Sequence, residues 1–331
     1  MTISYQVENT NITNELLIQM YSTMLKIRMF EEKIIEVYPV QDMQCPVHLC
    51  IGEEAIAAGV CLNLKKEDYI FSTHRNHGHC VAKGSDMKLM MAEFYGKKTG
   101  YSKGKGGSMH MVDPENGILG TSAIVGGAIP LAVGTALASA MKKDGRVSAA
   151  FFGDGAAEEG TFHESLNFAS LKKLPVVFVC ENNFYATNSY ISARQPHNDI
   201  AKKAESYLIP SVQIDGNDVV AVYEEARKAV ERARAGKGPS FIECRTYRWK
   251  GHVGPDCDYE KGCRPKEELD VWMDRCPVKT FEDFILKNKS ISEKELQQLK
   301  ANIAKELDNA VSYGRTSPLP DDKELFEDVY A

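Results

Sequence analysis

The chain has 331 residues, 43% of them hydrophobic and 26% charged, which is enough to bury the core of one large α/β domain. The formal net charge of −6 and the dispersed basic residues argue against a nucleic-acid-binding protein. No apolar run reaches the roughly 18–20 residues of a membrane span, and the first residues lack a secretion-signal pattern, so we expect no membrane segment. The nine scattered cysteines are typical of reduced thiols, so we expect a cytoplasmic protein.

Helical periodicity dominates the first part of the chain. Apolar residues recur at helical spacing from Asn14 to Tyr38, which predicts a core-facing or interface helix capped by Asn14. Glu53 to Cys61 and Met87 to Tyr95 predict further helices. The segment Pro130 to Met141 is apolar on all sides and rich in small residues. We therefore expect it to be buried against another helix or subunit.

The second half alternates apolar runs with helical segments. Val147 to Phe152 and Pro175 to Cys180 predict two parallel strands joined by a crossover helix. Val212 to Asp215 and Phe241 to Cys244 predict later strands of the same sheet, separated by a charged helix over Val219 to Ala235. The expected fold class is thus α/β, with a mostly parallel sheet flanked by helices.

Two long polar segments interrupt this pattern, at Asn188 to Ala204 and at Gly251 to Arg264. Long loops of this kind often carry the functional site of an enzyme. Helical periodicity returns only near the C-terminus, where Ser292 to Tyr313 predicts a polar, lysine-rich helix.

Polar motifs follow both central strands. Asp154 lies between Gly153 and Gly155 after the first strand, and Asn183 follows the second. Open α/β sheets bind ligands at the carboxyl ends of their strands, so these two side chains should converge. Carboxylate and amide oxygens suit Mg²⁺ beside the phosphates of a cofactor, and the glycines let backbone N–H groups approach a phosphate. The alternative interpretation is a strand-to-helix turn in which Asp154 caps the helix.

Other cofactor and metal motifs do not fit. The dinucleotide fingerprint G-x-G-x-x-G would require a glycine where Glu158 stands, and no Walker A sequence surrounds Lys105. These mismatches disfavour a nicotinamide dehydrogenase. Because Cys257, Cys263 and Cys276 include no C-x-x-C pair, we interpret them as thiols and not as metal ligands.

The pair GDG and NN resembles the thiamine diphosphate motif. HLCIGEEAIAAG, THRNHGHCVAKG, GKGGSMHM, AIVGG and TYRWKGH accompany it. Together these motifs resemble the α subunit of the decarboxylating component of 2-oxo acid and acetoin dehydrogenase complexes, over nearly the whole chain. The resemblance implies a thiamine diphosphate-binding fold with an N-terminal helical arm (1–40), a central cofactor-binding domain (41–275) that carries the diphosphate and metal half of the site, and a C-terminal helical segment (276–331).

The resemblance also implies the cofactor contacts. Mg²⁺ would be held by Asp154, Asn183 and the backbone carbonyl of Tyr185. Arg75 follows the apolar run Tyr69 to Ser72 and would clamp a phosphate oxygen of thiamine diphosphate with its planar fork of donors. The further cofactor contacts expected are His48, His74, Ala123, Val125, Gly155, Ala156 and His252.

Histidines are the catalytic candidates. By resemblance, His252 lies beside the cofactor, where it would stabilise negative charge or relay protons. His77 is the second candidate. Of His77 and His79, one side chain would face the active-site channel and the other would be structural, and the sequence does not decide which.

The resemblance further implies a second chain. Thiamine enzymes need a glutamate at the pyrimidine ring, and Glu158 and Glu159 lie in the metal half of the motif. We therefore expect a β subunit to supply this glutamate in an α₂β₂ heterotetramer, and a lipoyl-bearing acyltransferase to accept the acyl group. The chain alone would be inactive. A scaffold without catalysis is disfavoured by the intact Asp154, Asn183 and Arg75.

Two departures from the family pattern bear on substrate and regulation. His74 stands where the family often has tyrosine, which is closer to the acetoin-type branch. The expected substrate is acetoin or a 2-oxo acid such as pyruvate. The alternatives are a branched-chain 2-oxo acid, or an unusual substrate of a related thiamine-dependent enzyme. Val253 stands where animal pyruvate-type relatives carry a phosphorylatable serine, so that mode of control is absent at this position.

Overall fold

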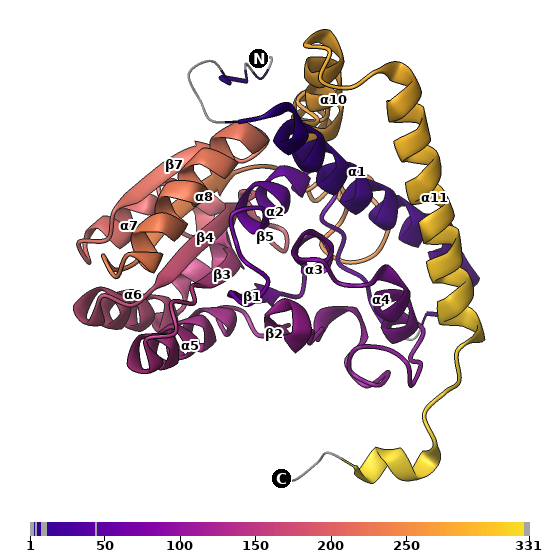
Figure 1. The fold of residues 1–331 in the computed structure, drawn as a ribbon, viewed down its shortest axis with the longest axis horizontal. Helices are drawn as coiled ribbons and strands as arrows, with labels where there is room; N and C mark the ends of the chain where they lie inside the picture. Colours follow the sequence, from indigo (N-terminus) through magenta and orange to yellow (C-terminus); the bar gives the residue numbers. More distant parts are fainter. Residues whose placement is uncertain (1–2, 4, 8–11, 44, 328–331) are drawn as a thin grey trace.

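The computed structural model describes residues 3, 5–7, 12–43 and 45–327. Its centre is a six-stranded sheet in the order β2-β1-β3-β4-β8-β7, in which all paired neighbours are parallel (Figure 1). The strands are β1 (Tyr69–Thr73), β2 (Ile118–Ser122), β3 (Ser148–Gly153), β4 (Val176–Asn182), β7 (Ser211–Asp215) and β8 (Ser240–Arg245), and β5 (Tyr185–Ala186) pairs separately with β6 (Ser189–Tyr190). The predicted α/β fold with a parallel sheet is confirmed.

Both faces of the sheet are buried, which explains why its central strands are continuous apolar runs. Successive side chains of a strand point to opposite faces, so Ala149 and Phe151 of β3 join one hydrophobic cluster while Ala150 and Phe152 join the other. The first cluster lies under α2 (Glu54–Cys61) and α8 (Val219–Arg234). The second lies under α5 (Ala128–Lys142), α6 (Gly160–Lys172) and α7 (Ala201–Glu205).

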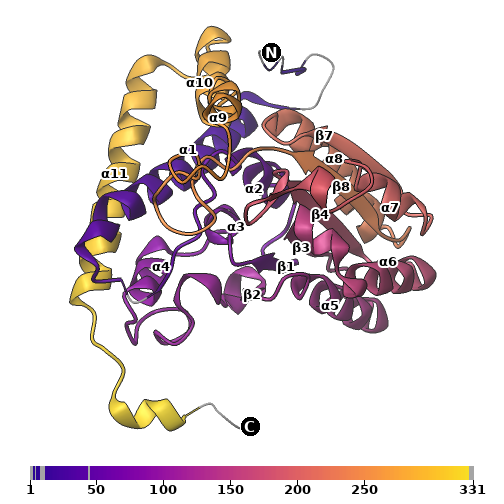
Figure 2. The ribbon, with the colours of Figure 1, turned by 180° about the vertical axis from the view of Figure 1, so that it is seen from behind.

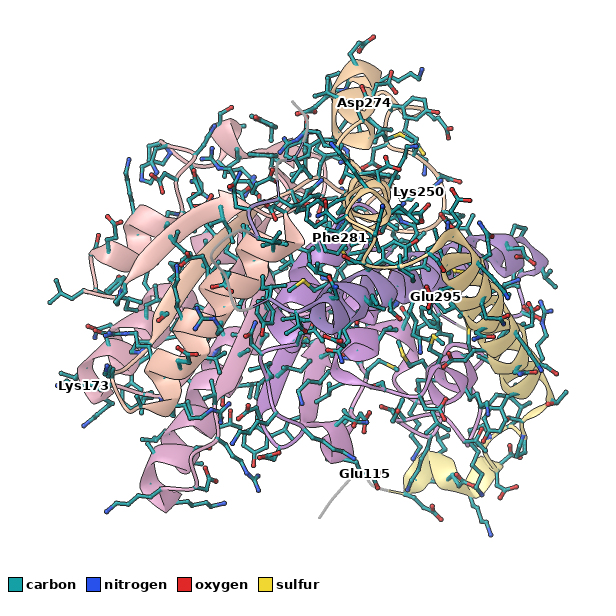
Figure 3. The ribbon with its side chains drawn as sticks, turned by 45° about the horizontal axis from the view of Figure 1, so that its top comes forward. Glu115, Lys173, Lys250, Asp274, Phe281 and Glu295 are labelled. Atoms are coloured by element: carbon teal, nitrogen blue, oxygen red, sulfur yellow. The ribbon has the colours of Figure 1, made fainter. Side chains whose placement is uncertain are left out.

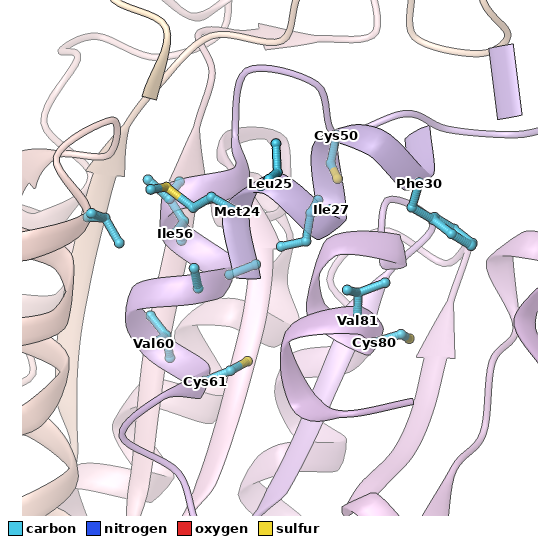
Figure 4. Close-up of a cluster of buried hydrophobic side chains, with 14 of the residues drawn as sticks. Met24, Leu25, Ile27, Phe30, Cys50, Ile56, Val60, Cys61, Cys80 and Val81 are labelled. Atoms are coloured by element: carbon cyan, nitrogen blue, oxygen red, sulfur yellow. The ribbon is translucent and has the colours of Figure 1, made fainter. Parts of the chain in front are cut away.

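An outer group of helices covers α2. It comprises α1 (Asn14–Val37), α3 (His77–Lys83), α4 (Met87–Phe94), α10 (Pro277–Lys287) and α11 (Glu293–Thr316). Figure 4 shows Met24, Ile27 and Phe30 of α1, Ile56 and Val60 of α2, and Cys80 and Val81 of α3 in one buried cluster. The long helix α11 runs beside α4 and α1, and the chain then leaves the body toward the C-terminus (Figures 1 and 2). The N- and C-terminal helices therefore share the core of the sheet domain.

Most charged side chains lie at the surface of the molecule and most large apolar side chains lie in its core. In Figure 3 the charged side chains of Lys173 and Asp274 lie at the rim of the molecule, whereas Phe281 on α10 is fully buried. No helix in the described part of the chain has the length and apolar character needed to cross a membrane.

Most predicted elements are present, with two corrections. The helices predicted near residues 14–38, 53–61, 87–95, 219–235 and 292–313 are α1, α2, α4, α8 and α11. The cap of α1 is Thr13 and not Asn14, because the Thr13 side chain accepts a hydrogen bond from the Leu16 N–H. Helix α5 is buried on one side only: Leu131 and Met141 are 53% and 76% exposed. In the single chain, the expected all-round burial of this helix is incomplete.

Candidate functional site

A cavity lies at the carboxyl ends of the strands. Its walls are formed by segments that follow β1, β2, β3 and β4, together with His252 from the loop after β8 and Glu53 from the segment before α2. The chain continues from β1 to β2 on one side and from β3 to β4 on the other, so the cavity lies at the point where the strand order reverses. Such switch points are the ligand sites of open α/β sheets.

Asp154 and Asn183 line this cavity together, as the sequence predicted. Each directly follows its strand, β3 or β4, and both side chains are buried. Burial raises the pKa of the Asp154 carboxyl, and the positive charge of Arg194, which binds its Oδ2, opposes that shift. The alternative interpretation of Asp154 as a helix cap is wrong, because α6 begins at Gly160 with Glu159 as its N-cap residue.

Two buried glutamates, Glu53 and Glu181, lie next to these residues, and the sequence analysis did not predict them as site residues. Glu53 Oε1 accepts a hydrogen bond of 2.8 Å from the Asn183 amide, which leaves the Asn183 Oδ1 free of that partner. Burial raises the pKa of Glu53 to about 7, and the nearby charge of Glu181 adds to this effect. Glu181 lies 3.1 Å from the ring Nε2 of His79. Glu53 belongs to the quoted GEEA motif, so its position could have been flagged, but its partners come from distant segments.

Arg75 ties three segments of the site together. Its side chain is 6% exposed and lines the cavity. One terminal nitrogen donates to the Leu49 carbonyl at 2.7 Å and the other to the His252 carbonyl at 3.2 Å, while Nε lies 3.7 Å from Glu53 Oε2. Because a guanidinium has five N–H groups, these contacts leave donors for a ligand.

His74 and His252 line the cavity, and the buried His48 ring packs against both of them. Burial and the neighbouring Arg75 charge lower the pKa of all three imidazoles, to about 3 for His48, about 2 for His74 and about 4 for His252. The three rings are therefore neutral at pH 7. The sequence analysis predicted each as a cofactor contact but not that they form one cluster.

His77 and Ala123 are not brought to the cavity. His77 is fully buried on α3, where its Nδ1 lies 3.0 Å from Glu31 Oε2 and its ring packs against Phe94 at a centroid distance of 4.9 Å. This geometry gives no support to a catalytic role for His77. His79, the alternative left open by the sequence, contacts Glu181 at the cavity wall but is itself buried. Ala123 lies just before Ile124 and Val125, which do line the cavity.

The glycine-rich loop around Lys105 does not face the cavity. It encloses the carboxylate of Glu93, a fully buried residue on α4. Glu93 accepts four backbone hydrogen bonds of 2.7–3.0 Å, from the N–H groups of Ser102, Gly104, Gly106 and Gly107. The loop thus forms an anion-binding turn, and the anion that it binds is the Glu93 carboxylate of the same chain.

Both predicted polar loops contribute to the site. The first carries Arg194, which binds Asp154 and Glu158. The second carries His252 and is held by Arg264, whose guanidinium binds Asp258 and stacks 5.1 Å from the ring centroid of Tyr185. Figure 2 shows this second loop between β8 and α9 (Lys266–Met273). The loops therefore link the outer surface to the residues at the strand ends.

Comparison with known proteins agrees with this geometry. Residues 21–322 match the family described as dehydrogenase E1 component. The chain is 45% identical to the α subunit of acetoin:2,6-dichlorophenolindophenol oxidoreductase from Bacillus subtilis (strain 168), over 98% of this chain and 96% of the relative. It is 39% identical to the subunit of the same name from Cupriavidus necator, over 96% and 95% of the two chains. It is 40% identical to the pyruvate dehydrogenase E1 component subunit alpha of Porphyra purpurea, over 97% and 94%.

Proposed function

The chain belongs to the dehydrogenase E1 component family, and on this premise we propose that it is the α subunit of a thiamine diphosphate-dependent dehydrogenase that cleaves acetoin or a 2-oxo acid such as pyruvate. The observation that carries the proposal is the convergence of Asp154, Asn183 and Arg75 on one cavity at the switch point of the sheet. The family implies thiamine diphosphate, whose thiazolium carbanion supplies the nucleophile. The protein then has to bind, orient and shield it.

The donor set suits Mg²⁺ and a diphosphate. Asp154 offers a carboxylate oxygen, Asn183 an amide oxygen and Tyr185 a backbone carbonyl, and Mg²⁺ prefers oxygen ligands. The Asn183 amide nitrogen is engaged by Glu53, and its oxygen accepts one hydrogen bond of 3.3 Å from the Tyr185 N–H, so a second lone pair of that oxygen is left for a cation. Phosphate oxygens would be held by the remaining donors of Arg75 and by backbone N–H groups at Gly155 and Ala156, both of which line the cavity.

The histidines suit proton and charge handling beside the cofactor. His252 lines the cavity, and burial together with the Arg75 charge keeps its pKa low, at about 4. A neutral imidazole can take up a proton or donate its N–H to an oxygen that gains negative charge. We assign this catalytic role to His252, with His74 beside it, and we withdraw it from His77.

The exposed apolar side chains beside the cavity support a β subunit as the partner of this chain. Ile124 and Val125 at the cavity are 72% and 51% exposed, and the exposed face of α5 continues this surface with Leu131 and Met141. Large apolar side chains gathered beside a site mark a protein interface. We propose that a β subunit covers them in an α₂β₂ heterotetramer and supplies the activating glutamate, and that a lipoyl-bearing acyltransferase accepts the acyl group.

The compartment we propose is the cytoplasm. All nine cysteines are free thiols, and six of them are buried in the core, among them Cys61, Cys180 and Cys244. Reduced thiols are typical of a reducing compartment.

The decisive experiment uses the chain co-expressed with its β subunit. Calorimetric titration with thiamine diphosphate should give Mg²⁺-dependent binding that Asp154→Asn weakens at least about tenfold. The exposed Asp274→Asn is the matched control and should bind as the wild type does. Dichlorophenolindophenol reduction is then followed with acetoin, pyruvate and branched-chain 2-oxo acids, and acetoin is expected to be the best substrate. Wild-type affinity in Asp154→Asn would contradict the metal assignment.

A further inference from the structure

Three imidazoles face one another at the cavity from three distant segments. His48 precedes α2, His74 follows β1, and His252 lies in the loop after β8. The ring centroids are 4.7 Å apart for His48 and His74, and 5.2 Å apart for each of the other two pairs. One ring nitrogen of each residue lies within 4.8 Å of the corresponding nitrogens of the other two.

His48 lacks the partners that a buried imidazole normally has, and the half-buried rings of His74 and His252 face the cavity. His48 is 7% exposed, and its Nδ1 is buried without a hydrogen-bond partner. Among the described residues, no hydrogen bond reaches a ring nitrogen of His74 or His252 either; the bond from Arg75 goes to the His252 backbone carbonyl. Three nitrogen lone pairs are therefore available on one side of the cavity.

The backbone that carries the cluster is fixed. Arg75 follows His74 in the chain, and its guanidinium binds the carbonyls of Leu49, next to His48, and of His252. Only the rings have to move to bring three nitrogens onto one ion. Tetrahedral Zn²⁺ with Zn–N distances of about 2.0–2.1 Å needs nitrogens about 3.3 Å apart. A side-chain rotation that moves each ring nitrogen by about 1 Å provides this spacing.

We propose that His48, His74 and His252 form a three-histidine site for Zn²⁺ in the cofactor-free protein. Imidazole nitrogen favours Zn²⁺ and other late transition metals, whereas Mg²⁺ and Ca²⁺ favour oxygen ligands. Three histidines with an open fourth position match zinc sites that retain a water molecule. The charges of Arg75 and Arg248 oppose a dication, and the ionised form of the Glu53 carboxyl, 3.7 Å from Arg75 Nε, offsets part of that opposition.

This site would compete with the cofactor. His74 and His252 line the same cavity that we assign to thiamine diphosphate, so this consequence, unlike zinc binding itself, rests on the proposed function. Zn²⁺ would enter before the cofactor and block it. Enzyme already loaded with cofactor would resist zinc.

The test uses the α/β complex stripped of cofactor, with Co²⁺ as the spectroscopic probe and Zn²⁺ as its competitor. One Co²⁺ per α chain should bind, giving visible bands of a tetrahedral nitrogen site, and Zn²⁺ should displace it while excess Mg²⁺ does not. His74→Phe should weaken Co²⁺ binding at least about tenfold, since even indirect support of a metal ligand contributes that much. His110→Ala is the matched control, because His110 is exposed and outside the cluster.

Several outcomes would overturn the site. One is wild-type Co²⁺ affinity in His74→Phe, and another is an intense sulfur-to-cobalt band that identifies cysteine ligands. Melting temperatures show whether a variant is folded, and His48→Asn provides a second variant that removes one ligand. If thiamine diphosphate binds normally but Co²⁺ does not, the zinc site fails alone. If Co²⁺ binds but the complex without a transition metal does not bind thiamine diphosphate, the zinc site stands and the cofactor assignment fails.

Discussion

Glu93 should control the stability of the glycine-rich loop, and Glu93→Gln is the change that tests it. In the structure each carboxylate oxygen accepts two backbone N–H groups: Oε2 those of Ser102 and Gly104, and Oε1 those of Gly106 and Gly107. A glutamine keeps the shape but replaces one oxygen by an NH₂ group. Whichever way the amide is turned, two N–H donors then face a third donor.

The cost follows from the two lost bonds. Hydrogen bonds to a charged group contribute about 1.5–3 kcal/mol each, so the loss is about 3–6 kcal/mol. With an unfolding entropy of about 2.1 cal/mol/K per residue, a chain of 331 residues should lose about 4–9 °C of melting temperature. Where the loop opens locally instead, trypsin should cleave faster after Lys103 or Lys105.

Thermal unfolding and timed trypsin digestion with mass spectrometry measure both responses. Glu115→Gln is the matched control, because Glu115 is exposed on a neighbouring turn. Equal melting temperatures and equal cleavage rates in the two variants would refute the idea that the Glu93 carboxylate organises the loop. The loop matters to the site because Ser108, at its end, accepts a hydrogen bond of 2.9 Å from Asn76, close to His74 in the chain.

Three further changes have defined outcomes. The pKa of His48 is about 3 in the folded chain and about 6.5 in the unfolded chain, so the unfolded state binds more protons between these pH values. The free energy of unfolding is therefore full above pH 6.5 and falls as the pH drops, by about 2 kcal/mol at pH 5. His48→Asn should accordingly reduce the drop in melting temperature between pH 8 and pH 5 by about 3 °C. Met141→Asp on the exposed face of α5 should prevent heterotetramer assembly in light-scattering measurements while the melting temperature of the α chain stays within about 1 °C. Arg264→Lys removes the stacking on Tyr185 and the guanidinium contacts with Asp258 and with the Arg248 and Lys250 carbonyls. Trypsin should therefore cleave the loop after β8 faster than in the wild type, and an unchanged rate would argue against this anchor.

The sequence predicted the sheet because parallel strands covered on both faces appear as continuous apolar runs. The same reasoning predicted Asp154 and Asn183, since each follows such a run directly. It could not predict Arg194 or Glu53, whose roles depend on how a long loop and a distant helix return to the strand ends. Nor could it group His48 with His252, because residues this far apart in the chain meet only through tertiary packing. For α5 the sequence left two covers open, another helix or another subunit, because an apolar pattern does not say whether the covering surface belongs to the same chain.

The two side chains proposed to bind Mg²⁺, Asp154 and Asn183, share one arrangement. Each has a partner that occupies the end of the side chain that a cation does not use: Arg194 binds one oxygen of Asp154, and Glu53 binds the amide nitrogen of Asn183. A cation that takes the other Asp154 oxygen and the Asn183 oxygen therefore has no need to displace either partner. Outer partners of this kind fix ligand orientation and tune affinity in metal sites. The proposed metal half of the cavity is in this way oriented within the chain, whereas Ile124 and Val125 on its apolar side are exposed, which is the asymmetry expected of a site that a second subunit would complete.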